Sequence, residues 1–325
     1  MTVGFYAECV IIITYEELYL NREKEAKAMN YGYLAAASAY IIWGLLPVFW
    51  KLLAQLPAVY ILSARIVYSF FFCVVLVLLK KNWAQIKAEL KQPKRMARIA
   101  LAGAMVTLNW GVYIWAVNNG HIVESSMGYY LNPLIVILFS TCFFKEKMTM
   151  WEWLAMMLAA LGVMIMIIRF RQVPWIALTL AVSFASYGAV KKTLHLDGLT
   201  SLTLETACMF PIFFAVLFWM EGQGQGAVPY GWGVLLLSMV SGIVTAIPLL
   251  LYGTAVKTIP FSTVGFFQYI APTISLALGV AFYGEVFTIE DFMVFIFIWL
   301  GLAVYLGSSL YRLWADYRHK VNVTE

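Results

Sequence analysis

The sequence predicts an all-α integral membrane protein with ten transmembrane helices, arranged as two inverted repeats of five helices each. Its composition is 63% apolar, 16% aromatic and only 12% charged, whereas roughly a quarter of the residues in a soluble domain are charged. Ten apolar stretches have the length, about 17 to 25 residues, that crosses a bilayer as a helix. Residues 103–162 also recur at residues 242–301 with a constant offset of 139 positions, which indicates a duplication.

Five of these stretches lie in the first half of the chain. They cover residues 31–53, 57–79, 99–118, 124–144 and 150–168. Between the second and the third, residues 80–98 carry apolar side chains at helical spacing among lysines, which predicts a short interfacial helix. Pro133 lies within the fourth stretch and predicts a kink there. Thr149 and Glu152 form a capping-box pattern that begins the fifth stretch.

The second half contains the other five stretches. They cover residues 174–190, 201–220, 231–254, 261–283 and 289–311. Pro272 again predicts a kink, now in the ninth stretch, and Thr288 with Asp291 repeats the capping pattern before the tenth. Asn109 in the third stretch aligns with Pro248 in the eighth, so one copy carries a hydrogen-bonding side chain where the other carries a helix breaker.

The internal repeat rests on residue types that hydrophobicity alone does not explain. The matches at the fixed offset are Gly103 with Gly242, Tyr113 with Tyr252, Tyr130 with Tyr269, Pro133 with Pro272, Glu146 with Glu285, Thr149 with Thr288 and Gly162 with Gly301. Each copy holds an odd number of predicted spans, so the two copies must cross the membrane in opposite directions. Inverted repeats of this kind are typical of secondary transporters.

The positions of lysine and arginine predict the orientation, because short cytoplasmic loops are enriched in these residues. Of the 22 Lys and Arg residues, 18 fall on one side of the predicted topology and three on the other, with Arg65 inside a span. The 18 are Arg22, Lys24, Lys27, Lys80, Lys81, Lys87, Lys91, Lys94, Arg95, Arg98, Lys145, Lys147, Lys191, Lys192, Lys257, Arg312, Arg318 and Lys320. We therefore expect both termini, including a tail at residues 312–325, to be cytoplasmic.

Residues 1–28 form a tail that differs from the rest of the chain. No Lys or Arg precedes its short apolar run and no small-residue cleavage site follows, so a secretory signal peptide is not predicted. Two interpretations stay open. The tail is either a disordered extension or translated sequence upstream of a true start at Met29, since residues 24–26 can be encoded by a bacterial ribosome-binding sequence. The two repeats then occupy residues 30–168 and 174–311.

A Glu-x-x-Thr motif stands before a closing apolar span in each half, at Glu146 with Thr149 and at Glu285 with Thr288. We expect the two glutamates to anchor interfacial loops and therefore leave them out of the candidate site. The motif, present once per half, resembles the EamA domains of the drug/metabolite transporter superfamily. The resemblance covers about residues 30–311. It implies ten helices in two inverted five-helix repeats, a central cavity and transport by alternating access.

A narrower resemblance is carried by Trp43-Gly44, Pro47, Trp110 and the segment 129–134, which look like the RarD branch of that superfamily. This resemblance implies a multi-pass protein of the bacterial cell membrane. Members of the superfamily move amino acids, other metabolites, drugs or nucleotide sugars, and the RarD branch carries a label of chloramphenicol sensitivity. The cargo, the coupling ion and the direction of transport stay open.

Arg65 and Glu205 are the leading candidates for the transport site, because a charge deep in a span is costly and usually faces the protein interior. From their distances to the span centres, Arg65 is expected on the outer side of the midplane and Glu205 on the inner side. We expect Arg65 to face an outward vestibule and bind an anionic group. Glu205 is expected to be protonatable or to pair with a cationic group nearer the cytoplasm. The alternative is that both residues only hold helices together.

The further substrate-binding candidates are polar or aromatic residues placed within or near the spans. They are Asn109, Trp43, Trp110, Tyr113, Tyr129, Tyr130, Asn132, Gln268 and Tyr269. Two alternatives apply here. Asn132 can cap the backbone freed by Pro133 instead of contacting cargo, and the tyrosines can pack between helices with a hydrogen bond.

The function predicted from these features is a secondary transporter of a small polar metabolite or drug. No P-loop or histidine pair is present in the sequence, so neither an ATP-driven pump nor a metal enzyme is predicted. A non-transporting membrane scaffold and a membrane-embedded enzyme are the alternatives. We expect no catalytic residues, cofactor or metal. The expected partners are a small-molecule substrate and the lipid bilayer, with no nucleic acid. A homodimer is left open, although one chain already contains both repeats.

Overall fold

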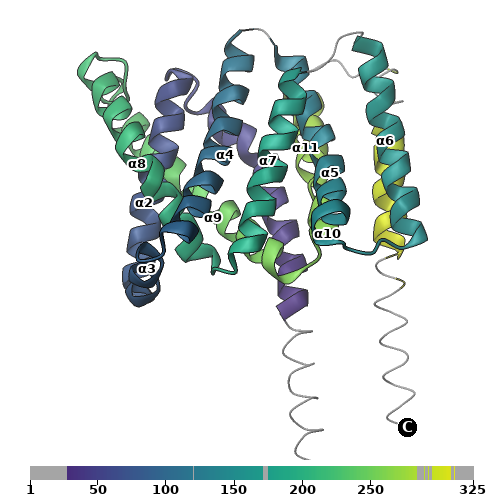
Figure 1. Cartoon of the computed structure of the whole chain (residues 1–325). Helices are drawn as coiled ribbons and strands as arrows, with labels where there is room; N and C mark the ends of the chain where they lie inside the picture. The colour runs from purple at the N-terminus through teal and green to yellow at the C-terminus, as the bar shows by residue number, and fades with distance from the viewer. Residues whose placement is uncertain are drawn as a thin grey trace, which may run out of the picture.

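The computed structural model of the chain describes residues 28–119, 121–170, 175–283 and 295–308, with residues 289, 292 and 311. The two predicted tails and the second capping pattern, at residues 288–291, lie almost wholly outside these ranges. The described residues are almost entirely helical. Figure 1 shows most helices running side by side across the molecule, with the α5–α6 connection at the same end as α3 and α10.

Among the described residues, six helices are long and apolar enough to cross a membrane. They are Ala28–Lys51, α2 (Ala58–Leu79), Pro93–Ala116 within α4 (Pro93–Asn118), α8 (Gly198–Gly222), α9 (Trp232–Thr258) and the pair α10–α11 over Phe261–Leu278. Shorter apolar helices, Gly128–Phe144, Met150–Ile165 and Phe295–Ser308, fall at the predicted fourth, fifth and tenth spans. They belong to α5 (Ile122–Phe144), α6 (Met150–Phe170) and the last described helix, while α7 (Trp175–Leu194) falls at the sixth.

Two local sequence patterns are confirmed. The capping box at the start of α6 is present, because the backbone N–H of Thr149 donates to Glu152 Oε2 at 2.7 Å and the N–H of Glu152 donates to Thr149 Oγ1 at 3.3 Å. The segment after α2 forms a short helix, α3 (Trp83–Leu90). Its Ile86 is buried, whereas Trp83 and Leu90 are exposed as in a helix at a membrane surface.

The ninth predicted span is broken instead of kinked at its proline. α10 (Phe261–Phe267) ends before a turn at Gln268 and Tyr269, and α11 (Ile270–Tyr283) follows. Pro272 therefore lies in the first turn of α11, where the missing N–H removes no intrahelical hydrogen bond. Pro133, its partner in the repeat, lies inside the continuous helix α5.

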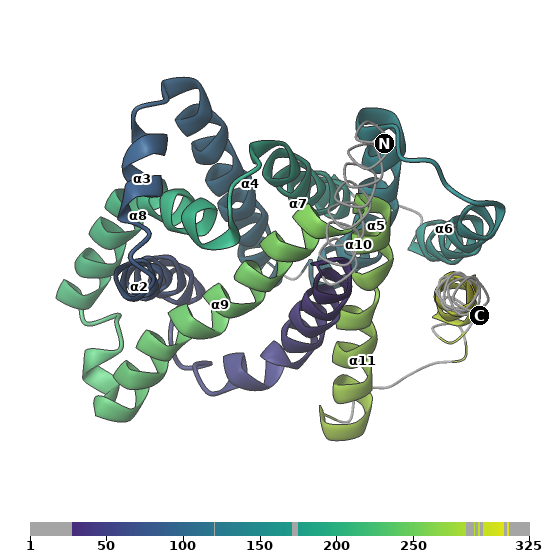
Figure 2. The same cartoon turned by 90° about the horizontal axis from the view of Figure 1, so that it is seen from below.

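Two close helix crossings bring α4 against α8 and α9 against α2. At Gly103 of α4, an added Cβ would lie 2.9 Å from the carbonyl oxygen of Glu205 in α8. At Gly242 of α9, it would collide with the backbone of Tyr68 in α2. Seen along the helices, α2 lies between α8 and α9, and α4 and α5 pack against α7 (Figure 2). These contacts place α2, α4, α8 and α9 next to one another, with α2 and α8 toward one edge of the molecule (Figure 2).

Glu146 ties the α5–α6 connection to two other helices, as expected for a loop anchor. Its carboxylate accepts hydrogen bonds from Lys192 Nζ at 2.8 Å and from the backbone N–H groups of Phe261 at 2.8 Å and Ser262 at 2.9 Å. We call these four residues the Glu146 latch. The carboxylate caps the start of α10 and neutralises a lysine of α7, so the latch holds three segments together at one end of the molecule.

Candidate functional site

A small cavity lies between α2, α4, α8 and α9, with about 20 Å³ of space, which is room for about one water molecule. Its wall includes Trp110 and Thr107 of α4 and Glu205 and Thr206 of α8. Most of the remaining wall is aliphatic. The cavity is thus largely apolar with a few polar groups, as small-molecule sites are, but it must widen to admit a ligand larger than water.

Arg65 reaches toward this region from α2 and is surrounded by aromatic side chains. Its Nε donates to Thr245 Oγ1 at 3.0 Å. Its guanidinium carbon lies 4.6 Å from the ring centroid of Trp50 and 4.3 Å from that of Trp110. Tyr113 and Tyr129, whose rings pack at 5.7 Å, lie within electrostatic range of the guanidinium. We call Arg65, Trp50, Trp110, Tyr113, Tyr129 and Thr245 the arginine cage.

The arginine cage leaves most of the guanidinium free to bind a ligand. Within the described part of the chain, Arg65 forms no ion pair with an acidic side chain, and one hydrogen bond uses one of its five N–H donors. The two tryptophan rings partly compensate the cost of removing the cation from water. The remaining donors of a guanidinium can bind a carboxylate or a phosphate through two parallel hydrogen bonds.

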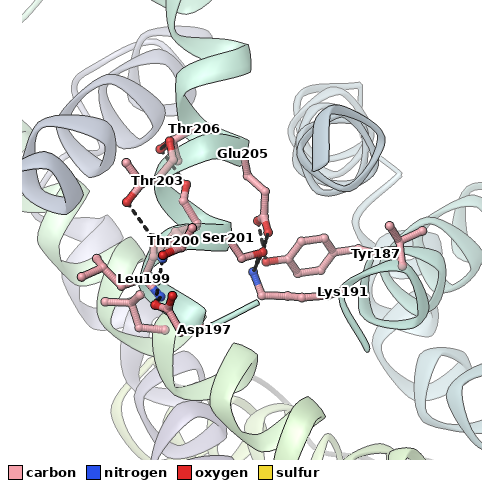
Figure 3. A network of polar contacts seen from close by, with 12 residues as sticks. Tyr187, Lys191, Asp197, Leu199, Thr200, Ser201, Thr203, Glu205 and Thr206 are labelled. Atoms are coloured by element: carbon pink, nitrogen blue, oxygen red, sulfur yellow. Dashed lines mark hydrogen bonds and ion pairs between the residues drawn. The ribbon is translucent and has the colours of Figure 1, made fainter. Parts of the chain in front are cut away.

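Glu205 lies in a second polar group, which Figure 3 shows between α7 and α8. Lys191 Nζ lies 2.6 Å from Glu205 Oε1, and each side chain is about 2% exposed. The hydroxyl of Ser201 also donates to Glu205 Oε1, and the hydroxyl of Tyr187 donates to Oε2 at 3.1 Å. We call these four residues the inner ion-pair site. Asp197 caps the start of α8 nearby by accepting from the N–H groups of Leu199 and Thr200.

The burial of Lys191 corrects the sequence analysis, which counted it among the lysines of a cytoplasmic loop. α7 extends to Leu194, beyond the predicted end at residue 190, so Lys191 belongs to the helix. Its aliphatic chain passes the backbone of Gly253 in α9, where an added Cβ would lie 2.7 Å from Lys191 Cε. Arg65 and Glu205 are therefore not the only charges within the helices.

An aromatic cluster adjoins the inner ion-pair site. Tyr187 stacks on Tyr252 with a centroid distance of 5.8 Å, and Trp43 lies 5.7 Å from Tyr252 and 5.1 Å from Tyr40. Among the described residues, the hydroxyls of Tyr40 and Tyr252 and the polar atoms of Gln268 are buried without a well-formed hydrogen bond, although Gln268 lies within reach of the Tyr40 hydroxyl. We call Tyr40, Trp43, Phe184, Tyr187 and Tyr252 the aromatic cluster. Gln268, at the break between α10 and α11, lies next to Tyr40.

The remaining sequence candidates make contacts between helices. The Asn109 amide donates to the carbonyl of Leu180 at 2.7 Å and to Ser183 Oγ at 3.1 Å, which joins α4 to α7. The hydroxyl of Tyr269 donates to the carbonyl of Tyr130 at 3.4 Å. This contact links the two repeat-equivalent tyrosines.

Tyr130 itself packs edge-on against Phe295 at 5.1 Å. Asn132 is buried, and its Oδ1 has no hydrogen-bond partner among the described residues.

The structure thus brings seven of the eleven sequence candidates into three groups. Trp110, Tyr113 and Tyr129 join Arg65 in the arginine cage, Trp43 and Gln268 lie in or beside the aromatic cluster, and Glu205 lies in the inner ion-pair site. Sequence reasoning missed Trp50, Thr245 and Lys191 as members of these groups. Each of these residues contacts a partner on a different helix, and no local sequence pattern predicts contacts between helices.

The chain is similar to known proteins over most of its length. The sequence profile of the EamA-like transporter family matches it twice, at residues 30–168 and 173–307. Protein RarD of Salmonella typhimurium is 41% identical over 292 residues, which cover 88% of this chain and 98% of that protein. The uncharacterized transporter YojE of Bacillus subtilis is 40% identical over 283 residues, covering 86% and 94%.

Two further matches are more distant. The chloramphenicol-sensitive protein RarD of Pseudomonas aeruginosa is 28% identical over 277 residues, covering 83% of this chain and 92% of that protein. One solved crystal structure shares the fold with a TM-score of 0.63 at 16% identity, covering 84% of this chain and 96% of the other. Because the family profile spans nearly all of both halves, the chain belongs to the EamA-like transporter family.

Proposed function

We propose that this protein is a secondary transporter that moves a small anionic metabolite or drug across the bacterial cell membrane by alternating access. The observation that carries the proposal is the arginine cage, where a cation deep in the protein has aromatic neighbours but no acidic partner among the described residues. A charge inside a membrane protein needs a partner or water. A mobile anion in the adjoining cavity meets that need and is released with the cargo.

The proposed architecture is ten helices in two inverted repeats. It is supported by the two glycine crossings, because Gly103 and Gly242 are equivalent at the offset of 139 residues. The first places α4 against α8 and the second places α9 against α2, so each joins the third helix of one repeat to the second helix of the other. A twofold exchange of the repeats maps one crossing onto the other, as alternating access by repeat motion requires.

The test is binding of candidate anions to the purified protein. Benzoate, lactate, glutamate and inorganic phosphate are compared by thermal shift with chloramphenicol, which is uncharged at neutral pH, using wild type and Arg65→Gln. We expect at least one anion to stabilise the wild type, with an affinity about 10- to 100-fold lower in Arg65→Gln, the range expected for a lost charged hydrogen bond. Arg98→Gln, which removes an exposed arginine from the end of α4, is the matched control.

Binding alone does not establish transport, so the anion that binds is then tested for saturable uptake into proteoliposomes. A transporter gives uptake that saturates and that falls in Arg65→Gln at subsaturating concentration. Absence of any anion effect, equal binding in Arg65→Gln, or binding of chloramphenicol alone contradicts an anionic cargo. Binding without flux supports a scaffold instead.

A further inference from the structure

Lys191 is a buried cation that Glu205 neutralises in this structure, and Glu205 in turn lines the cavity between α2, α4, α8 and α9. We propose that Lys191 binds the anionic group of the same cargo when the transporter is open to the cytoplasm, and that Glu205 holds this position while the inner side is closed. This inference rests on the proposed function, since it assumes an anionic cargo. It assigns to the inner ion-pair site a binding role beyond that of the arginine cage.

The contacts of the inner ion-pair site allow such an exchange. An ammonium group has three N–H donors, and the described partners of Lys191 are Glu205 Oε1 at 2.6 Å and Ser201 Oγ at 3.2 Å. If an anion takes the place of Glu205, the carboxylate keeps the hydroxyl donors of Ser201 and Tyr187. Neither charge is then left buried without a partner, which is the condition that makes burial of an ion pair tolerable.

Arg65 and Lys191 are each linked through a neighbouring residue to the same small, largely apolar cavity. Arg65 lies seven residues after the start of α2, and Glu205 lies seven residues after the start of α8, its equivalent in the other repeat. Trp110 contacts the Arg65 guanidinium and also lines the cavity, while Glu205 lines the same cavity and binds Lys191. An anion that leaves Arg65 through this cavity therefore meets Lys191 next.

The repeat relates the surroundings of the two cations. Tyr113 and Tyr129, beside Arg65, align at the offset of 139 residues with Tyr252 and Gln268, next to the aromatic cluster. Tyr252 stacks on Tyr187, which in turn donates to Glu205. The inner ion-pair site thus has the same kinds of neighbours as the arginine cage, but its aromatic rings are packed together.

The unpaired polar atoms around the aromatic cluster are an independent indication of a ligand. The Tyr252 hydroxyl, in a side chain that is 0% exposed, has no hydrogen-bond partner among the described residues, and the Gln268 amide, 4% exposed, has only the Tyr40 hydroxyl within reach. A buried polar group that is left unsatisfied is costly. Cargo or water that enters when the cluster opens would satisfy them, so these atoms are suited to a cytoplasm-facing binding state.

The experiment measures the Michaelis constant at each face of the membrane. The probes are radiolabelled benzoate, lactate, glutamate and inorganic phosphate, with uptake into proteoliposomes sorted by orientation so that either the outer or the cytoplasmic face is loaded. The main variant is the double substitution Lys191→Met with Glu205→Gln. It removes both charges together, so that no buried charge is left without a partner. Lys257→Met, which removes an exposed lysine near the inner end of α9, is the matched control for surface charge.

We expect the double variant to raise the Michaelis constant at the cytoplasmic face at least tenfold and to change the outer value less than threefold. Arg65→Gln is expected to show the opposite pattern, and Lys257→Met neither. Glu205→Gln alone removes the competitor of the cargo for Lys191, so it should lower the cytoplasmic Michaelis constant several-fold. A purely structural ion pair gives no reason for tighter binding in that variant.

The possible failures are distinguishable. If no probe is taken up in an Arg65-dependent manner, the proposed function fails and the inference fails with it. If uptake depends on Arg65 but the double variant leaves the cytoplasmic Michaelis constant unchanged, only the inference is overturned. If the double variant does not fold, an unchanged or raised cytoplasmic constant in Glu205→Gln overturns the inference, and a lowered one supports it.

Discussion

Arg65 and Lys191 carry the same charge but are stabilised in different ways, and the difference follows from their chemistry. The guanidinium of Arg65 is planar and weakly hydrated, so tryptophan rings can cover it while part of its hydrogen-bonding edge stays free. The ammonium of Lys191 is compact and strongly hydrated, and it is buried only with Glu205 at 2.6 Å. Arginine is therefore the better residue for a buried cation that has no acidic partner, and lysine is suited to one that is paired with a carboxylate.

Substitution of Arg65 by lysine tests this distinction. A lysine keeps the positive charge but cannot bind a carboxylate through two parallel hydrogen bonds or stack on the rings of Trp50 and Trp110. We expect Arg65→Lys to fold and to bind the probe anion about tenfold more weakly than wild type, a loss of about 1.4 kcal/mol. Isothermal titration measures the affinity, with Arg98→Lys as the control. Full affinity in Arg65→Lys would show that charge alone is sufficient.

At the scale of helices, the structure depends on two kinds of contact that set the distances between elements. Glycines permit close crossings, as at Gly103 and Gly242, and the Glu146 latch joins a loop to α7 and α10. The glycine crossings hold together helices that line the cavity, and the Glu146 latch joins segments at one end of the molecule. A substitution that disrupts either contact should therefore lower the stability of the protein.

The crossing of α4 with α8 is tested by two alanine substitutions in the same helix. At Gly103 the new Cβ would lie 2.9 Å from a backbone carbonyl, which cannot move without shifting α8. At Gly111 nothing lies within 4 Å, and alanine is favoured over glycine in a helix by about 1 kcal/mol. We expect Gly103→Ala to lower the melting temperature and Gly111→Ala to leave it equal or higher. The reverse order would contradict the crossing.

The Glu146 latch predicts a pH dependence. Burial raises the pKa of the Glu146 carboxyl, but the hydrogen bonds from Lys192, Ser262 and Phe261 outweigh it and hold the pKa below the ordinary value of 4.5. Because the pKa is lower in the folded protein than in the unfolded chain, the ionised latch stabilises the fold above pH 4.5. That contribution is lost as the pH falls through the lowered pKa.

Glu146→Gln measures this contribution. We expect the variant to be less stable than wild type by about 1.5 to 3 kcal/mol at neutral pH, the range for hydrogen bonds to a charged group. The difference in melting temperature should be constant at neutral pH and should shrink as the pH is lowered below 4.5, where wild type also loses the charge. A difference that persists undiminished in acid would show that the latch acts without ionisation.

For the whole molecule, the distribution of lysines and the inverted repeat make one joint prediction about topology. Lysines occupy the loops expected on the cytoplasmic side in both halves, although the repeats themselves are proposed to face opposite ways. The positions of the lysines thus correlate with the expected cytoplasmic side of the membrane and not with equivalent positions in the two repeats. This is the behaviour expected if membrane insertion, governed by charge, oriented the two copies in opposite directions.

Labelling of single cysteines tests the topology. Gln223, after α8, and Gln92, between α3 and α4, are both exposed and lie on opposite sides in the proposed arrangement. In intact cells, a membrane-impermeant thiol reagent is expected to label a cysteine at Gln223 but not one at Gln92. Labelling of both after permeabilisation is the control for accessibility. The inverse pattern in intact cells would refute the proposed orientation.

Local physical chemistry explains what the sequence alone determined. Membrane class, the positions of the helices, the short helix α3 and the capping box at Thr149 depend on hydropathy and on residues a few positions apart. The duplication is also readable directly, because both copies lie in one chain. Arg65 and Glu205 were found because a charge in an apolar stretch is conspicuous without any knowledge of its neighbours.

Only the tertiary structure decided which partners these charges have. Arg65 binds Thr245, which is 180 positions away, and the pairing of Lys191 with Glu205 depends on the packing of α7 against α8 and α9. Whether Lys191 points to water or into the core depends on the space left by Gly253 and on a carboxylate from another helix. Hydropathy is a property of each segment, whereas burial of a charge is a property of the segments once they are packed together.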